Sequence, residues 1–378
     1  MSVADMRIDT FRLRELRIPF KTAFKHASAS RAATSSVWVE ALAAGNIVGH
    51  GEACPRPYVT QETIESARAF VSTHGESICD RVHDLESLRR WMDEHLEDID
   101  ANPAAWCSVE LACLDAFGRR AGQTIEAVLG LPPLSGTFAY TAVAGDDEPT
   151  AFHALVHRYE RLGFLDFKVK LSGDLDRDRQ KLAVFAPLLE RGVRVRADAN
   201  NIWDSAAEAA DALSRLGFSW FALEEPIRAN QYEELRGLAR DAGCPVVLDE
   251  SLARRQQFEY LSEPPGQWLV NVRVSKMGGL LRSLDVVAEA RRRGIGVIVG
   301  AQVGETSLLT RAGLTVAHAA ADGLVAQEGA FGTHLLETDV CDPPLMFGAR
   351  GLIEVASVGW LAAPGLSGIA GPGESVLR

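Results

Sequence analysis

The sequence of 378 residues has no apolar run long enough to cross a membrane, and the apolar stretch at 296–300 is typical of its longest ones. Its first residues also lack the basic and then apolar pattern of a signal peptide. It has no run of five or more basic residues, and 51 acidic against 39 basic side chains give a net charge of −12. These absences argue against a membrane or a nucleic acid as the partner.

Metal-binding and disulfide patterns are missing as well. The six cysteines form no Cys-x-x-Cys pair and no regular framework, so we expect free thiols in a reducing cytoplasm. No His-x-His or His-x₃-His pair ends a strand pattern, which disfavours a zinc hydrolase. His153 and His157 are four residues apart, but on a helix of surface type.

Hydrophobic residues make up 47% of the chain, enough for a large core. The first 130 residues contain both strand patterns and helix patterns. Alternation of apolar and polar residues at 6–13 predicts a strand, and helical spacing of apolar residues predicts helices at 85–96 and 104–120. A further helix is expected from about residue 61, with Thr60 as its N-cap. The segment 130–136 is rich in Gly and Pro, and we place a domain boundary there.

From residue 137 short apolar runs alternate with amphipathic stretches, which predicts parallel strands joined by helices. A polar residue ends each run, at steps of 24 to 29 residues. An open doubly wound sheet would also alternate in this way, but polar residues at the end of every strand favour a closed barrel with a single mouth. The expected strands are 138–142, 165–171, 193–198, 219–224, 245–249, 268–274, 296–302 and 324–328.

Three of these strands end in an acid: Asp198, Glu224 and Asp249. Adjacent strands lie roughly 5 Å apart, so the three carboxylates would converge and repel one another unless a divalent cation neutralised them. An oxygen-only site of this kind suits Mg²⁺. The alternative is that each acid simply caps a helix, since Asp is common at such turns.

Basic residues end two other strands. Lys168 and Lys170 lie on one face of their strand, where two like charges lower each other's pKa and produce a lysine that can serve as a base. On an exposed strand the same pair would only form a solvated face. Arg273 ends the strand that faces the acids, and Lys276, three residues later, is expected on the opposite face or in the loop.

Five ordered motifs resemble the enolase superfamily, in its muconate-lactonizing branch: Lys168-x-Lys170, Asp198-x-Asn200, Glu224-Glu-Pro226, Asp249-Glu-Ser251 and Asn271 to Lys276-x-Gly-Gly279. The resemblance implies an α/β protein, a modified TIM barrel of (β/α)₇β type with an N-terminal α+β capping domain. We expect the capping domain at 1–130, the barrel at 131–330 and, at 331–378, a segment that returns to the capping domain.

The resemblance also implies a mechanism. Asp198, Glu224 and Asp249 would hold Mg²⁺, with Mn²⁺ as a substitute, and the ion would bind the carboxylate of a small-molecule substrate. Lys170 would abstract the α-proton, and Lys168 would tune the pKa of Lys170. The metal would stabilise the enediolate that results. Members of the family are often even-numbered assemblies, so a homo-oligomer is expected.

One departure from the family pattern concerns the reaction. The branch normally has lysine where this chain has Arg273, and arginine keeps its proton, so it is a poor second base. Lys276 would replace it only if its loop folded inward. One-base chemistry at Lys170 is therefore favoured: we expect a muconate cycloisomerase-like isomerase, with an acid dehydratase (syn elimination of water) or a racemase or epimerase as alternatives.

Other departures concern the substrate. The eighth strand has Ala326-Gln-Glu-Gly329 and not the Asp-x-Asp of dipeptide epimerases, which leaves Glu328 to meet a cation. Two capping loops, 20–31 and 52–60, would select the substrate, and their polar residues favour a polar or dianionic acid. The candidate substrate-binding residues are Lys25, His26, Arg56, Tyr58, Asn200, Gln302, Glu305 and Glu328.

Two more distant functions stay open. A metal-free Schiff-base aldolase would use Lys168 or Lys170 as its nucleophile, but it would not explain three converging acids. A non-catalytic binding protein would have lost its second base, although the intact Lys170 and the intact acids argue against such a loss.

Overall fold

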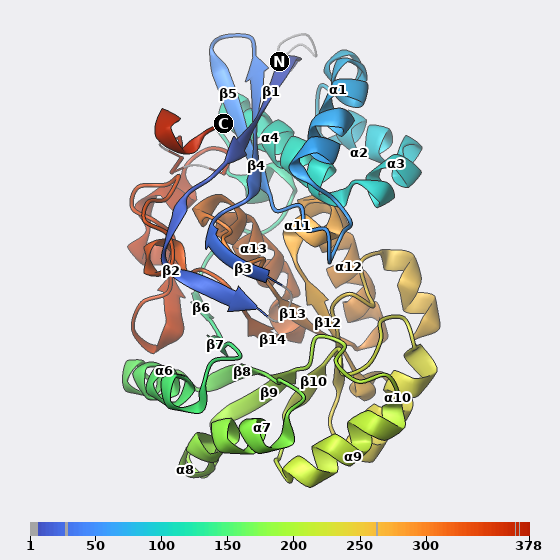
Figure 1. The fold of residues 1–378 in the computed structure, drawn as a ribbon. Helices are drawn as coiled ribbons and strands as arrows, with labels where there is room; N and C mark the ends of the chain where they lie inside the picture. The colour runs from blue at the N-terminus through green and yellow to red at the C-terminus, as the bar shows by residue number, and fades with distance from the viewer. Residues whose placement is uncertain (1–6, 27–28, 262–263, 367, 370) are drawn as a thin grey trace.

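The structure is a computed structural model, which describes residues 7–26, 29–261, 264–366, 368–369 and 371–378; for residues 22–26 and 29–31 only the backbone is described. The chain forms an N-terminal part of antiparallel strands and helices that lies against a larger curled sheet of parallel strands with helices around it (Figure 1). The predicted fold class, a barrel with an N-terminal cap, is confirmed. The exact domain boundaries stay a prediction.

The capping part is a three-stranded antiparallel sheet backed by helices. The strands β1 (Ile8–Leu16), β4 (Ser36–Ala43) and β5 (Ile47–Ala53) pair in the order β1-β4-β5. Two glycines of β5 allow the close approach of α4, because a Cβ at Gly51 would lie 1.9 Å from the carbonyl oxygen of Ser108. The helices of this part are α1 (Ile64–Arg81), α2 (Leu85–Glu94), α3 (Leu96–Ala101), α4 (Pro103–Ala121) and α5 (Ile125–Val128).

Helix α1 begins three residues later than the sequence predicted. Its N-cap is Thr63 and not Thr60, and the hydroxyl of Thr63 accepts a hydrogen bond from the backbone N–H of Ser66. The hydroxyl of Ser66 accepts one in return from the N–H of Thr63, which completes a capping box. A serine here takes the place of the Glu or Gln that is usual in a capping box.

The larger part holds eight parallel strands in sequence order around the sheet. A backbone hydrogen bond of 2.7 Å from the N–H of Thr141 to the carbonyl of Gln327 joins the two edges. The curled sheet therefore directs the carboxyl ends of its strands to one mouth. The strands are β7 (Ala142–Ala144), β8 (Asp166–Lys170), β9 (Arg194–Asp198), β10 (Ala222–Glu224), β11 (Val246–Leu248), β12 (Trp268–Val272), β13 (Gly296–Val299) and β14 (Leu324–Gln327).

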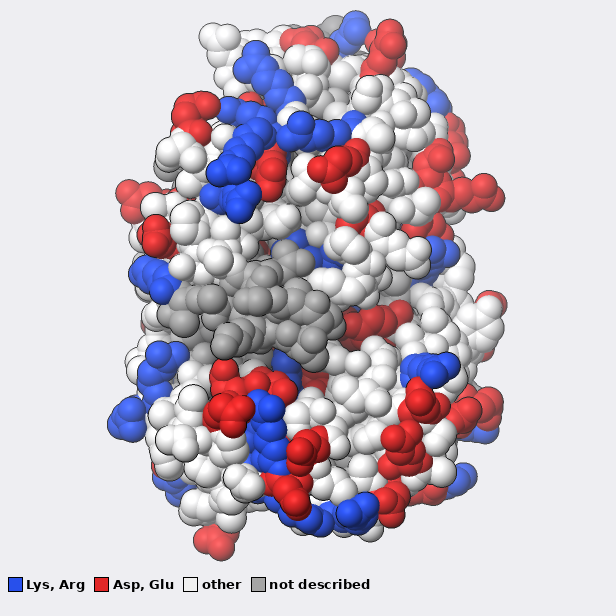
Figure 2. All heavy atoms as spheres, viewed as in Figure 1, with Lys and Arg blue, Asp and Glu red and all other residues white. Residues whose placement is uncertain are grey.

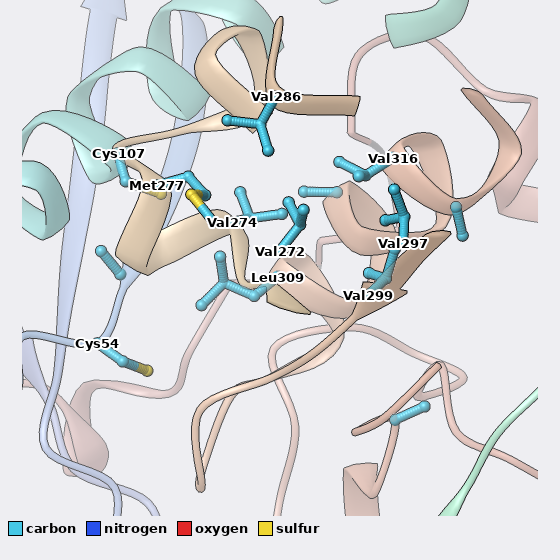
Figure 3. Packing of buried hydrophobic residues seen from close by; sticks show 14 of the residues in the cluster. Cys54, Cys107, Val272, Val274, Met277, Val286, Val297, Val299, Leu309 and Val316 are labelled. Carbon is cyan, nitrogen blue, oxygen red and sulfur yellow. The ribbon is translucent and has the colours of Figure 1, made fainter. Parts of the chain in front are cut away.

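Helices cover the outer face of this sheet (Figure 1). Apolar side chains of β12 and β13 pack beneath them, and Met277 of one helix lies next to Cys107 of α4, so that the barrel and the capping part share one core (Figure 3). The helices are α6 (Pro149–Leu162), α7 (Leu175–Leu182), α8 (Ala186–Leu189), α9 (Ala206–Leu216), α10 (Tyr232–Ala242), α11 (Val274–Met277), α12 (Leu280–Arg293) and α13 (Ser307–Ala320).

The first predicted barrel strand, 138–142, is in fact two short strands. β6 (Thr137–Ala139) pairs with β15 (Leu352–Glu354) of the C-terminal segment, and only β7 joins the barrel. The C-terminal segment also reaches the capping sheet, where Glu15 and Arg378 exchange two backbone hydrogen bonds of 2.8 and 2.9 Å. The segment thus contacts both parts of the chain, and not the capping part alone.

A hairpin of the capping part extends along the mouth of the barrel. It consists of β2 (Pro19–His26) and β3 (Ala29–Ala33) (Figure 1). Both basic and acidic side chains appear on the face that Figure 2 shows, in keeping with a chain that has both signs in quantity. Among the described residues, no helix combines the length and the apolar character needed to cross a lipid bilayer.

Candidate active site

The three predicted acids lie at the ends of three neighbouring strands. Asp198 ends β9, Glu224 ends β10 and Asp249 follows β11, and the first two are direct partners in the sheet register. Each is only 1% exposed. Such buried carboxylates need compensating positive charge, and here four basic side chains provide it.

Lys168 is the central cation of the site. Its Nζ lies 2.8 Å from Oε2 of Glu328, 3.2 Å from Oε1 of Glu224 and 3.3 Å from Oδ2 of Asp198. Burial alone would lower the pKa of Lys168, but these three carboxylates outweigh burial and raise it. Lys168 therefore carries a fixed positive charge and is not a base near neutral pH.

Lys170 has a different environment on the same face of β8. Its Nζ donates a hydrogen bond of 3.1 Å to Oδ1 of Asn200 and lies 3.8 Å from Oδ2 of Asp198. Burial lowers the pKa of Lys170, and the positive charges of Lys168 and Arg273 lower it further. Of the two lysines, Lys170 is thus the one that can lose its proton and act as a general base.

Arg273 follows β12 and faces the acids, as predicted. Its NH2 group forms a close ion pair with Oδ2 of Asp249 and lies 3.6 Å from Oε1 of Glu224. Its NH1 group donates to Oε1 of Gln302 over 3.5 Å. Burial would lower the pKa of Arg273, but Asp249 and Glu224 raise it. The guanidinium is a permanent cation and cannot serve as a base.

Lys276 lies in α11 and does not fold into the mouth as a free amine. Its Nζ is 2.8 Å from Oδ1 of Asp249, 2.9 Å from the carbonyl oxygen of Asn271 and 3.1 Å from that of Leu252. All the protons of its ammonium group have acceptors. This geometry favours a role in positioning Asp249 over the role of a second base.

The carboxylates suit a divalent cation by type and place, since they are hard oxygen donors on adjacent strand ends. In the described part of the chain, however, no group of three or more His, Cys, Asp or Glu side chains is arranged to hold a metal ion. Asp198 and Glu224 face Lys168, while Asp249 faces Arg273 and Lys276. The three carboxylates thus fit a divalent cation by their chemistry. The ion can bind them only if the cationic side chains that now contact them move away.

Three predicted pocket residues come from the last two barrel strands. Gln302 is buried, with an Nε2 atom that has no hydrogen-bond partner. The carboxylate of Glu305 accepts a hydrogen bond of 2.7 Å from the N–H of Gln302, and burial raises the pKa of Glu305 to about 7. Glu328 is held by Lys168 and by Arg196, whose NH2 lies 2.9 Å from its Oε1. Glu328 therefore has its cationic partners inside the protein.

The two capping loops, 20–31 and 52–60, carry four of the candidate substrate-binding residues. Arg56 is buried, and its guanidinium donates to the carbonyls of Ser35, Pro55 and Val303 at 2.7 to 2.9 Å. This arrangement favours a structural link between the two parts of the chain over substrate recognition. Tyr58 is 44% exposed. The side chains of Lys25 and His26 lie outside the described residues, so their predicted roles are unchanged.

One residue beside the three strand-end acids, Glu225, was not predicted from the sequence. Glu225 accepts hydrogen bonds of 2.7 Å from the N–H groups of both Asp249 and Ser251, and one of 2.8 Å from the hydroxyl of Ser251. Its backbone has φ of 38°, so its side chain diverges from that of Glu224. Two adjacent acids at the end of one apolar strand were the available signal, because they cannot both point into the barrel.

A family model described as "Enolase C-terminal domain-like" matches residues 151–367. The match covers more than half of the chain, so the chain belongs to this family, within the mandelate racemase and muconate lactonizing group of the enolase superfamily. The family predicted from the sequence is confirmed.

Individual relatives are more distant. The chain is 24% identical over 361 residues to a hydrophobic dipeptide epimerase from Enterococcus faecalis, which covers 94% of this chain and 99% of the relative. It is 26% identical over 201 residues to a cis-3-hydroxy-L-proline dehydratase from Roseibium aggregatum, covering 53% and 52%. The structure of a dipeptide epimerase from Cytophaga hutchinsonii, complexed with Mg and the dipeptide D-Ala-L-Val, matches with a TM-score of 0.84, 22% identity and 99% of both chains. This last likeness supports the fold.

Proposed function

We propose that this protein is a Mg²⁺-dependent enzyme in which Lys170 removes the proton next to the carboxylate of a small, amino-acid-derived substrate. The observation that carries the proposal is the contrast between two lysines on one strand face. Lys168 is fixed by three carboxylates, whereas Lys170 has only an amide and one distant carboxylate as partners. A buried amine of lowered pKa at a strand end, beside converging acids, is typical of a general base.

Each nearby residue contributes one function. Asp198, Glu224 and Asp249 would hold the Mg²⁺, which would acidify the α-proton of the substrate when bound. Lys168 repels a proton on Lys170 by its charge, and Asn200 orients the amine through its Oδ1. Glu225 fixes the backbone on either side of Glu250 and thereby the carboxylate of Asp249.

The names of the relatives favour a reaction other than the one predicted first from the sequence. Several carry the names of epimerases or racemases that act on amino acids or their derivatives, and this favours the racemase or epimerase alternative over the muconate cycloisomerase. The same names support an amino-acid-derived substrate. Mn²⁺ as a substitute ion and a homo-oligomeric state remain predictions.

A second candidate reaction is the elimination of water with Lys170 as the only base. The observation that favours it is Arg273, a permanent cation that lies where an epimerase would need a second base. Lys276 does not fill this need, because its ammonium group is bound to Asp249 and to backbone carbonyls. The similarity to a dehydratase is compatible with this candidate.

The decisive experiment is proton exchange in D₂O, followed by NMR over a panel of dipeptides, N-succinyl amino acids and hydroxyprolines. Exchange at the α-carbon that needs Mg²⁺ and is lost in Lys170→Ala would support the proposal. Elimination would appear in the same spectra as loss of the β-hydroxyl substrate. Exchange that persists in Lys170→Ala, or that is indifferent to a chelator, would contradict it.

A further inference from the structure

The guanidinium of Arg273 occupies a position between two of the three strand-end acids. It pairs closely with Asp249 and lies 3.6 Å from Oε1 of Glu224, and Lys168 lies 3.2 Å from the same oxygen of Glu224. The three acids are therefore already compensated by side chains of the protein. Lys168 contacts Asp198 and Glu224 together, and Arg273 contacts Glu224 and Asp249 together.

The neighbouring strand leaves room for this arrangement. Gly300 follows β13 opposite Arg273, and a Cβ at Gly300 would lie 2.1 Å from Oδ1 of Asn271 and 3.0 Å from Cγ of Arg273. Asn271 in turn donates a hydrogen bond of 3.1 Å to Oε1 of Glu224. The missing side chain at 300 thus allows the stem of Arg273 and the amide of Asn271 to lie side by side against the acids.

Arg273 contacts Oδ2 of Asp249 and Oε1 of Glu224. A divalent ion bound between these two carboxylates would stand close to the guanidinium, and two positive charges at such a short distance would repel each other. The guanidinium cannot relieve the conflict by losing its proton. It can only move, and the acceptor that it already reaches on the other side is Oε1 of Gln302.

We propose that Arg273 is a resident cation of the acidic site, which a divalent ion must displace from Asp249 and Glu224 toward Gln302 in order to bind. The inference rests on the proposed function for the existence of the ion site. The coupling between two binding events is reciprocal. The contact of Arg273 with the acids therefore lowers the affinity of the site for the ion, and a bound ion weakens the contact of Arg273 with the acids to the same extent. Ion loading would therefore deliver a free guanidinium to the mouth.

The test is a titration of the purified full-length protein with Mn²⁺ alone, followed by calorimetry and by the electron paramagnetic resonance signal of free Mn²⁺. Arg273→Met should bind Mn²⁺ at least about tenfold more tightly than the wild type. Arg273→Lys should lie between the two, because it keeps the charge but lacks the planar, forked set of donors of the guanidinium. The matched control is Arg177→Met, which removes a guanidinium that pairs with Asp146 and Glu148; its affinity should stay within about twofold.

A second measurement uses the wild type and does not depend on the folding of a variant. Labelling by phenylglyoxal, mapped by mass spectrometry, should increase at Arg273 when Mn²⁺ is added and stay constant at Arg177. Equal Mn²⁺ affinities of wild type and Arg273→Met, or unchanged labelling of Arg273 in an Mn²⁺-loaded protein, would overturn the inference and leave the ion site standing. Absence of Mn²⁺ binding in every variant would overturn both.

Discussion

The buried ammonium group of Lys181 donates a hydrogen bond of 2.8 Å to the backbone carbonyl of Lys170. The same group lies 2.9 Å from Asp146 and 2.9 Å from Asp178, so its three protons are all engaged. Asp178 also accepts hydrogen bonds from the backbone N–H groups of Ser172 and Gly173. The backbone that follows the proposed base is therefore held by a charge network that is not in the mouth.

We expect Lys181→Met to destabilise the protein and to slow proton exchange. Removing one partner of a buried ion pair leaves uncompensated charge, here on Asp178, since Asp146 keeps Arg177 as a partner, and costs roughly 3–5 kcal/mol. Urea unfolding measures this loss. Arg228→Met is the control, because its ion pair with Asp204 is exposed and its loss should have little effect. A stability of Lys181→Met equal to that of the control would show that the network is not important.

The two lysines of β8 should differ in their kinetics. Lys170→Ala should lower the rate of α-proton exchange by roughly 10²–10⁴, the usual contribution of a general base. Lys168→Ala removes the charge that lowers the pKa of Lys170, so the rise of rate with pH should move upward by roughly one pH unit. Rate profiles between pH 6 and 10 check both expectations. If the two variants exchanged behaviours, the roles of the lysines would be reversed.

Removing charge from the acids should abolish ion binding. Asp198→Asn and Glu224→Gln each take one anionic ligand from Mg²⁺, and we expect both activity and measurable Mg²⁺ affinity to disappear. Circular dichroism should show that the fold is kept. Full activity of either variant in the presence of a chelator would rule out the assignment of the site.

The contact between the capping part and the barrel should depend on pH. Glu110 of α4 accepts hydrogen bonds of 2.7 and 3.1 Å from the N–H groups of Leu280 and Leu281 in α12, and burial raises its pKa to about 8. The folded state thus binds this proton more tightly than the unfolded state. The stability that Glu110 adds is complete below its ordinary pKa near 4.5 and is lost as the pH rises toward 8.

The measurement is the urea midpoint at pH 5 and at pH 8 for the wild type and Glu110→Gln. The amide keeps the acceptor for Leu280 and Leu281 but cannot ionise, so the variant should lose less stability between the two values, by at least about 1 kcal/mol. Glu97→Gln, an exposed change in α3, serves as the control. Identical losses in wild type and Glu110→Gln would show that the carboxyl does not titrate in this range.

Much of the fold could be predicted because the strand ends repeat. Regular spacing of polar residues after apolar runs indicated the barrel. The positions of Asp198 and Glu224 followed from the ends of these runs, and the position of Lys168 followed from strand parity. The first barrel strand could not be predicted in the same way. The segment at 137–144 pairs with β15 over its first half and with β8 over its second, and a partner more than 200 residues away leaves no local pattern.

Other site features depend on contacts that spacing does not reveal. Strand parity predicted that Lys276 leaves the face of Arg273, but not that it turns back to Asp249 through α11. Lys181 follows Lys170 by eleven residues on a helix, and nothing in its local sequence marks it as fully buried. Arg56 looked like a surface recognition residue because two of the three backbone carbonyls that bind it, those of Ser35 and Val303, come from other segments of the chain.

The replacement of a lysine by Arg273 should make proton exchange one-sided. A guanidinium keeps its proton both in the pair with Asp249 and Glu224 and after displacement by the ion, so it cannot take up a proton from the substrate, and the face opposite Lys170 should lack a base. In D₂O, one enantiomer at the α-carbon should exchange and the other should not.

Arg273→Lys should introduce slow exchange of the second enantiomer, since an ammonium group near other cations can lose its proton. Arg273→Met should exchange only the first enantiomer, at a cost of roughly 2–4 kcal/mol if the guanidinium stabilises the developing negative charge. Wild-type exchange of both enantiomers at similar rates would contradict the one-sided site and support a two-base epimerase, and Lys276→Met would then show whether Lys276 leaves Asp249 to act as the second base.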